Sequence, residues 1–162
     1  MKEITFDFEN VGGLAEIYAI PPTSFIRIRT NYLTDKKYLD VKNRDDIIVI
    51  PMFADDTYVF NENKDTDDGG DYYDLSVEGV IPKEVFPNKQ IINNLERGQW
   101  FVLCQDNNNV VHFCGSEDIL MRFNTQKTTG TTYIDRNGIA FSFSCKQPES
   151  SEIIELDKLS DI

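Results

Sequence analysis

The stretch from Gly98 to Gly115 constrains the fold of this chain more than any other. Two apolar runs, residues 100–104 and 110–114, flank a turn cluster of one aspartate and three asparagines at residues 106–109. Asparagine and aspartate tolerate the positive φ that a tight reversal between strands requires. The stretch therefore predicts a buried β-hairpin. It also carries the only tryptophan, the only histidine and two of the three cysteines of the chain.

The register of this hairpin bears on its cysteines. With the turn centred on Asn107 and Asn108, we expect Cys104 to lie opposite Val111 and Cys114 to point to the other face. A disulfide between these two cysteines would then be geometrically awkward. The odd count of cysteines, and a first segment without the apolar core of an export signal, also favour reduced thiols.

Other apolar runs predict further strands. The run at 47–50 is β-branched, so we expect it to be buried on both faces. The pair Asn137-Gly138 predicts a second hairpin, with strands at 131–134 and 139–145. The remaining expected strands are residues 4–8, 14–20, 25–29, 57–60, 72–81 and 119–123.

One segment, Pro87 to Arg97, predicts a helix. Asn88 is a suitable N-cap, because its side chain can accept a hydrogen bond from an orphan backbone N–H. Gly98 can take the left-handed conformation that closes a helix. The expected apolar face comprises Ile91, Ile92 and Leu95.

Two segments are markedly polar. Residues 61–71 contain no apolar side chain, which predicts an exposed loop. Residues 148–162 form an acidic tail or docking arm, in which Ile153, Leu156 and Leu159 are spaced by three, as in a short helix.

These elements predict one β-rich domain, residues 1–147, followed by the segment 148–162. The fold class that we expect is mainly β: an antiparallel β-sandwich or barrel with one flanking α-helix at about residues 87–97.

The net charge of −12 at pH 7 bears on possible partners. Binding to duplex nucleic acid requires Lys and Arg to neutralise phosphates, so we expect no sequence-specific nucleic-acid binding. Anionic membrane surfaces are disfavoured for the same reason.

No catalytic constellation stands out. His112 lies within an apolar run, whereas nucleophiles and their bases usually lie on exposed loops, and no G-x-S-x-G motif is present. Phosphate-binding glycine loops and zinc spacings are missing too. We therefore expect no enzyme activity and no cofactor.

The acidic residues Asp65, Asp67 and Asp71 superficially match a calcium loop. Started at Asp65, however, the motif has Ser76 where an EF-hand needs Glu, and neither flank looks helical. A solvated loop is the better interpretation, and a looser oxygen-ligand site is the alternative.

Several side chains are candidates for protein contacts. Arg27 and Arg29 alternate with apolar residues, which places both on one strand face and suggests a salt-bridge surface for a neighbouring acidic copy. The other candidates are Asp67, Asp68, Ile153, Leu156 and Leu159.

The second half of the chain resembles a known group of proteins. A buried Trp100 hairpin ending at Gly115 is followed by an apolar segment at 119–123, a turn at Thr129-Gly130 and a hairpin at 135–138 that ends in Phe141-Ser142-Phe143. This succession, over residues 98–146, is similar to small structural proteins of tailed-phage or prophage virions, including tail-tube and related tail ring proteins.

The resemblance implies a β-sandwich or barrel with a flanking helix that assembles into rings. In tube proteins a negative inner surface lets DNA slide without sticking. The resemblance carries over no functional residue.

The leading hypothesis is thus a non-enzymatic tail structural or assembly protein, found in the cytoplasm during assembly and then in the virion, whose partners are its own copies and other virion proteins. A ligand- or carbohydrate-binding β-module, using Tyr58, Tyr72, Tyr73 or Trp100, is the alternative. A small enzyme or metal-dependent module is the third.

Overall fold

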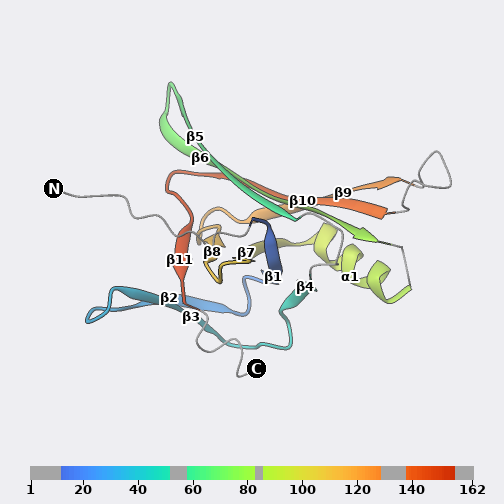
Figure 1. Ribbon diagram of the computed structural model, residues 1–162, viewed down its shortest axis with the longest axis horizontal. Helices are drawn as coiled ribbons and strands as arrows, with labels where there is room; N and C mark the ends of the chain where they lie inside the picture. Colours follow the sequence, from blue (N-terminus) through green and yellow to red (C-terminus); the bar gives the residue numbers. More distant parts are fainter. Residues whose placement is uncertain (1–11, 52–57, 83–85, 129–137, 156–162) are drawn as a thin grey trace.

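The fold is mainly β, with antiparallel strand ladders and one helix, as the sequence predicts (Figure 1). The computed structural model describes residues 12–51, 58–82, 86–128 and 138–155. The elements are β1 (Leu14–Ile20), β2 (Phe25–Asn31), β3 (Lys36–Val41), β4 (Ile48–Pro51), β5 (Val59–Asp67), β6 (Gly70–Pro82), α1 (Phe86–Arg97), β7 (Gln99–Asp106), β8 (Val111–Cys114), β9 (Met121–Thr128), β10 (Gly138–Gln147) and β11 (Glu152–Ile154).

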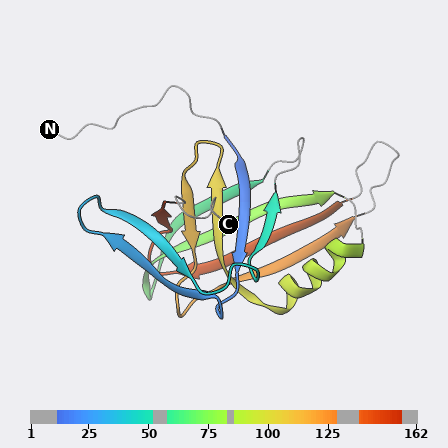
Figure 2. The ribbon, with the colours of Figure 1, turned by 90° about the horizontal axis from the view of Figure 1, so that it is seen from below.

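The strands form three layers, in the manner of a β-sandwich with an added hairpin. A central sheet has the order β4-β1-β7-β8-β11, and an outer sheet has the order β9-β10-β6-β5. The two sheets join where Trp100, at the start of β7, pairs with Met121 of β9. On the opposite face of the central sheet lies the β2–β3 hairpin, which Figure 2 shows from its own side.

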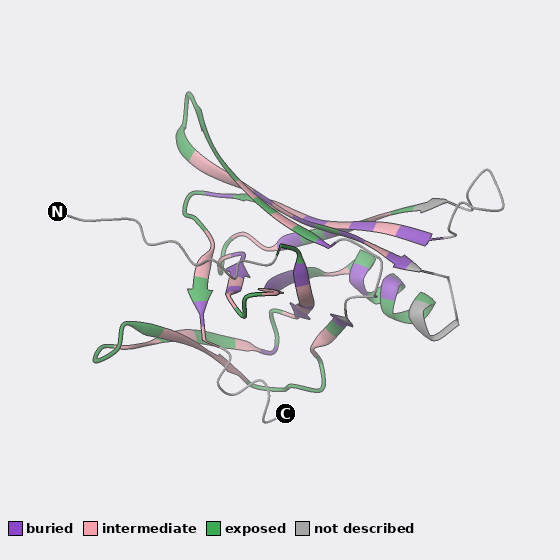
Figure 3. Ribbon diagram, in the orientation of Figure 1, coloured by how far each residue is buried: buried purple, intermediate pink, exposed green. Residues whose placement is uncertain are grey.

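Two apolar cores separate these layers, and β7 contributes to both. Trp100, Val102 and Cys104 point into the larger core, which the outer sheet and α1 cover. Phe101 and Leu103 point into the smaller core beneath the β2–β3 hairpin. The hairpin strand predicted from the sequence is apolar without interruption because both of its faces are buried (Figure 3).

Trp100 also fixes the end of the helix. Its indole Nε1 donates a buried hydrogen bond of 3.0 Å to the carbonyl oxygen of Leu95, in the last turn of α1. A Cβ added to Gly98 would lie 2.8 Å from the indole ring. Gly98 is therefore needed for the close approach of the ring. The expected left-handed closure is wrong, because Gly98 does not have a positive φ.

The helix prediction is confirmed, with two corrections. Ile92 and Leu95 are buried, but Ile91 is 42% exposed and does not belong to the packed face. The helix begins at Phe86, so Asn88 lies within it and not at its N-cap.

The expected loop at 61–71 is wrong. Residues 61–67 continue β5, which pairs with β6 from Val59 opposite Glu78 to Asp67 opposite Gly70. The backbone ladder does not need apolar side chains, and most of the tip is exposed as expected. The strand β3 was not predicted either. In β4, Val49 is 49% exposed, so the expectation of burial on both faces fails there.

β10 pairs with β9 on one side, with Gly138 opposite Thr128, and the strand expected at 131–134 lies outside the described residues. One prediction near the C-terminal end is also corrected. Residues 152–154 pair with β8 as the edge strand β11, which contradicts the helix expected from Ile153, Leu156 and Leu159. The strand expected at 4–8, the turn at 135–137, Leu156 and Leu159 lie outside the described residues.

Phe143 lies at the centre of the larger core, fully buried and 4.8 Å from the Phe123 ring. Phe143→Ala should lower the free energy of unfolding by about 3–5 kcal/mol, because it removes a buried ring and leaves a cavity. Urea denaturation followed by far-UV circular dichroism measures this loss. The control Val49→Ala should cost less than about 1 kcal/mol, and an equally small cost for Phe143→Ala would show that the core is misplaced.

The contact of Trp100 with Gly98 gives a second expectation. Gly98→Ala should destabilise the fold by about 1–3 kcal/mol, because the added methyl group displaces the indole ring from Leu95. Gly12→Ala is the matched control, since nothing lies within 4 Å of a Cβ at that position. Tryptophan fluorescence during urea unfolding measures both variants. Equal stability of the two would contradict the packing described here.

Candidate functional site

His112 does not form part of a complete catalytic triad in the described residues. Its Nδ1 lies 3.4 Å from the hydroxyl oxygen of Ser151, and its ring packs against Phe60 at 4.8 Å. The nearby carboxylate of Glu62 accepts a hydrogen bond from the backbone N–H of Ser151 and does not orient the imidazole. The Sγ of Cys104 faces the backbone oxygen of His112, at 3.8 Å. Among the described residues, this arrangement places a serine beside the ring and no carboxylate hydrogen-bonded to the imidazole.

The register of the central hairpin differs from the predicted one by one residue. Cys104 pairs with His112 and Val102 pairs with Cys114, so that both cysteines point into the same core. The expectation that they face opposite sides is therefore wrong. All three cysteines are nevertheless free thiols in the structure.

The environment of two thiols disfavours their reactive form. Two effects raise the pKa of Cys114 well above its ordinary value: a hydrogen bond with Cys104, which is the larger effect, and burial. Burial, with a smaller effect from the charge of Asp74, raises the pKa of Cys145 to about 11. Since the thiolate is the nucleophile, these cysteines lack the activation seen in catalytic sites.

The carboxylates suggested for calcium are engaged within the β5–β6 hairpin. Asp65 accepts hydrogen bonds from the backbone of Thr66 and from the hydroxyl of Tyr72, which hold its pKa below the usual value. Asp71 forms an ion pair of 2.6 Å with Lys64. Asp67 accepts the backbone N–H of Gly69 in the turn. In the described parts of the chain, no cluster of three or more metal-ligating side chains is found.

Arg27 and Arg29 lie on the exposed side of the β2–β3 hairpin. Both approach the same carboxylate of Asp40 on β3, at 3.1 and 3.7 Å. Two guanidinium groups thus share one intramolecular partner. Pairs as exposed as these contribute little to stability, which leaves the arginines accessible to a further anion.

The tip of this hairpin displays two large apolar side chains. Tyr32 is 91% exposed and Leu33 is 96% exposed. The turn that carries them is ordered, because the side chain of Asn31 accepts the backbone N–H of Leu33. Asp35 completes the turn in the left-handed region, at φ 53°. The sequence pattern did not predict this tip, because the strand β3 that follows it was not predicted.

Two of the four aromatic residues considered for carbohydrate binding are buried. Tyr58 and Trp100 are in the larger core and offer no face to a sugar. Tyr72 and Tyr73 are half-buried, and the ammonium group of Lys146 lies over the ring of Tyr72, 4.9 Å from its centre. The expectation that Trp100 is buried is confirmed.

Ile153 and Asp68 lie in different places, on strand β11 and in the turn between β5 and β6. Ile153 is 60% exposed on the outermost strand of the central sheet, whereas its neighbour Ile154 is buried in the smaller core. Asp68 is exposed in the turn between β5 and β6. Of the contact residues predicted from the sequence, those that the structure describes therefore lie in three separate places: on β2, at the tip of the β5–β6 hairpin and on β11.

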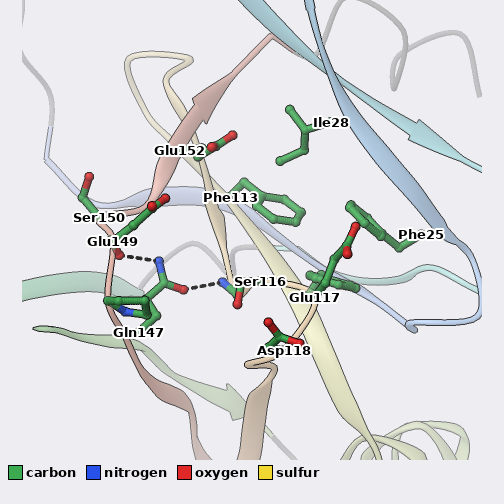
Figure 4. A pocket seen from close by; sticks show the side chains of 13 residues that line it. Phe25, Ile28, Phe113, Ser116, Glu117, Asp118, Gln147, Glu149, Ser150 and Glu152 are labelled. Atoms are coloured by element: carbon green, nitrogen blue, oxygen red, sulfur yellow. Dashed lines mark hydrogen bonds between the residues drawn. The ribbon is translucent and has the colours of Figure 1, made fainter.

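A groove of about 390 Å³ opens beside the smaller core (Figure 4). Its walls come from β2, from the loop that follows β8 and from the segment between β10 and β11. Sequence analysis missed this groove, because its walls are distant in the chain. The lining residues are Phe25, Ile28, Phe101, Phe113, Gly115, Ser116, Glu117, Asp118, Gln147, Pro148, Glu149, Ser150 and Glu152.

Neither a family model, nor a curated protein, nor a solved structure was found to match this chain. In the described residues, no helix has the length and apolar character needed to cross a membrane.

The raised pKa of Cys145 predicts slow alkylation. In the native protein at pH 8, iodoacetamide should modify Cys145 roughly 100-fold more slowly than in the denatured chain, because little thiolate is present. Mass spectrometry of timed samples measures this rate. Equal rates in the two states would contradict the environment described here.

The same shift predicts a loss of stability in alkali. The unfolded chain ionises Cys145 near its ordinary value of 9.0, and the folded chain does so at about 11. Between these values the unfolded state binds fewer protons, so the contribution of Cys145 to stability declines as the pH rises. Cys145→Ser should remove this part of the pH dependence.

Proposed function

We propose that this chain is a non-enzymatic assembly protein whose copies associate head to tail, through contact between the β2–β3 hairpin of one copy and the β5–β6 hairpin of the next. The observation that carries the proposal is the opposite charge of these two hairpins. The tail of a phage or prophage virion is the setting implied by the resemblance over residues 98–146.

The two hairpins differ strongly in formal charge. Residues 25–41 carry four basic and two acidic side chains, which is a formal charge of +2. Residues 59–82 carry one lysine and seven carboxylates, which is a formal charge of −6. The chain as a whole is acidic, but its β2–β3 hairpin is complementary in charge to its β5–β6 hairpin.

The positions of the two hairpins favour a head-to-tail contact. They belong to opposite outer layers, with the central sheet between them (Figure 1). A contact between two different surfaces of the same protein is heterologous, and repeated rotation closes it into a ring or extends it into a filament.

Charge alone does not hold such an interface. Exposed ion pairs contribute at most about 1 kcal/mol each, and the net charge of −12 opposes close packing of copies. The exposed Tyr32 and Leu33 supply apolar surface at the tip of the basic hairpin. Burial of these two side chains against the next copy would provide the hydrophobic contribution to the free energy of association.

Native mass spectrometry over a range of salt and protein concentrations tests the proposal. We expect oligomers of the wild-type chain that are most abundant at intermediate salt, because salt screens both the repulsion between acidic copies and the attraction between the two hairpins. The variant Y32S/L33S should remain monomeric. The matched control Ile91→Ser, which changes an exposed residue on α1, should assemble as the wild type does.

A mixing experiment distinguishes a head-to-tail contact from a symmetric one. The variant D67N/D68K reduces the charge of the acidic hairpin, and the amide oxygen that it introduces at position 67 can still accept the N–H of Gly69. This variant and Y32S/L33S should each be monomeric alone and should form a dimer of one copy of each when mixed. A wild-type chain that stays strictly monomeric at high protein concentration over the whole range of salt would refute the proposal.

A further inference from the structure

The groove beside the smaller core has an aromatic floor. The rings of Phe25 and Phe101 are stacked with their centres 4.2 Å apart, and the Phe113 ring lies 5.5 Å from that of Phe101. Phe101 and Phe113 are buried, whereas Phe25 and Ile28 are partly exposed at the side of β2. The floor can therefore receive an apolar side chain without rearrangement of the core.

The rim of the groove is acidic. Glu117 and Asp118 project from the loop after β8, and Glu149 and Glu152 come from the segment that leads to β11 (Figure 4). Of these four, only Glu152 forms an ion pair within the described part of the chain, with Lys37 at 3.0 Å. None of the residues that line the groove is basic.

Buried hydrogen bonds hold the two acidic walls in place. The side-chain oxygen of Gln147 accepts the backbone N–H of Gly115 at 3.1 Å, and its Nε2 donates to the backbone oxygen of Glu149 at 2.8 Å. Gln147 is 5% exposed, so it links the loop after β8 to the segment before β11 with little contact with solvent. The carboxylates thus converge on a preformed groove, which lowers the entropic cost of binding.

We propose that this groove binds a basic peptide segment of another protein, with one aromatic or aliphatic side chain on the phenylalanine floor and flanking Lys or Arg side chains on the carboxylates. Such a segment complements both the apolar floor and the negative rim. An arginine can also stack on the partly exposed ring of Phe25.

A second copy of this chain is a poorer occupant. Its overall charge of −12 opposes approach to an acidic rim. The residues that line the groove include none of the side chains on which the self-assembly test depends, which are Tyr32, Leu33, Asp67 and Asp68. Peptide binding and self-assembly can therefore each fail alone.

Fluorescence anisotropy with a fluorescein-labelled peptide of sequence GRKFRKLG tests the proposal on the full chain. We expect saturable binding that weakens as ionic strength rises. The variant E117Q/D118N should bind about tenfold more weakly, since it removes two rim charges. The matched control D45N/E78Q removes two charges from elsewhere and should change the affinity by less than about twofold. Glu149→Gln provides a second, single-site test from the opposite wall.

Two comparison peptides separate the groove from general attraction to an acidic protein. GRKSRKSG lacks apolar anchors, and GEDFEDLG lacks basic groups; both should bind at least about tenfold more weakly than GRKFRKLG. Methyl NMR should show the Ile28 signal shifting only with GRKFRKLG.

Three results would overturn the proposal. One is equal binding of GRKFRKLG and GRKSRKSG, which would indicate charge attraction alone. Another is equal affinity of E117Q/D118N and the wild type. The third is a shift of the Ile28 signal with the concentration of the Y32S/L33S variant in the absence of peptide, which would identify a second copy as the occupant, because this variant lacks the proposed hairpin contact.

Discussion

The burial of both faces of β7 is the constraint on which the rest of the structure depends. A strand that places Trp100, Val102 and Cys104 on one side and Phe101 and Leu103 on the other needs a cover on each side. The outer sheet and α1 cover the first face, and the β2–β3 hairpin covers the second. The three-layered architecture follows from this one requirement.

This architecture also determines where functional groups can lie. The two cysteines of the central hairpin are buried in the larger core, where a hydrogen bond with Cys104 and burial raise the pKa of Cys114, and His112 is half-buried beside Phe60. The accessible features are at the periphery: two hairpins of opposite charge, and a groove where the smaller core meets the surface. These features suit contacts between proteins, which is why both proposals concern binding surfaces.

Local sequence patterns predicted strands and helices well where one face of the element is buried, because buried side chains then recur with the period of that element. The alternation in β10 and the helical spacing of Ile92 and Leu95 are examples, because each buried side chain follows from the geometry of its own element. The pattern failed for residues 61–67, where a ladder with β6 holds a strand that has no apolar side chain. It also failed for residues 152–154, which pair with β8 although the spacing of the apolar residues suggested a helix.

By itself, the sequence determined the fold class, the central hairpin, the helix and the acidity of the chain, because each depends on composition or on neighbours within a few residues. Only the tertiary structure decided the one-residue register of Cys104 and Cys114, the pairing of β11 with β8 and the groove built from β2, the loop after β8 and residues 147–152. These features join segments far apart in the chain. Their geometry depends on how whole layers pack, and no local period records it.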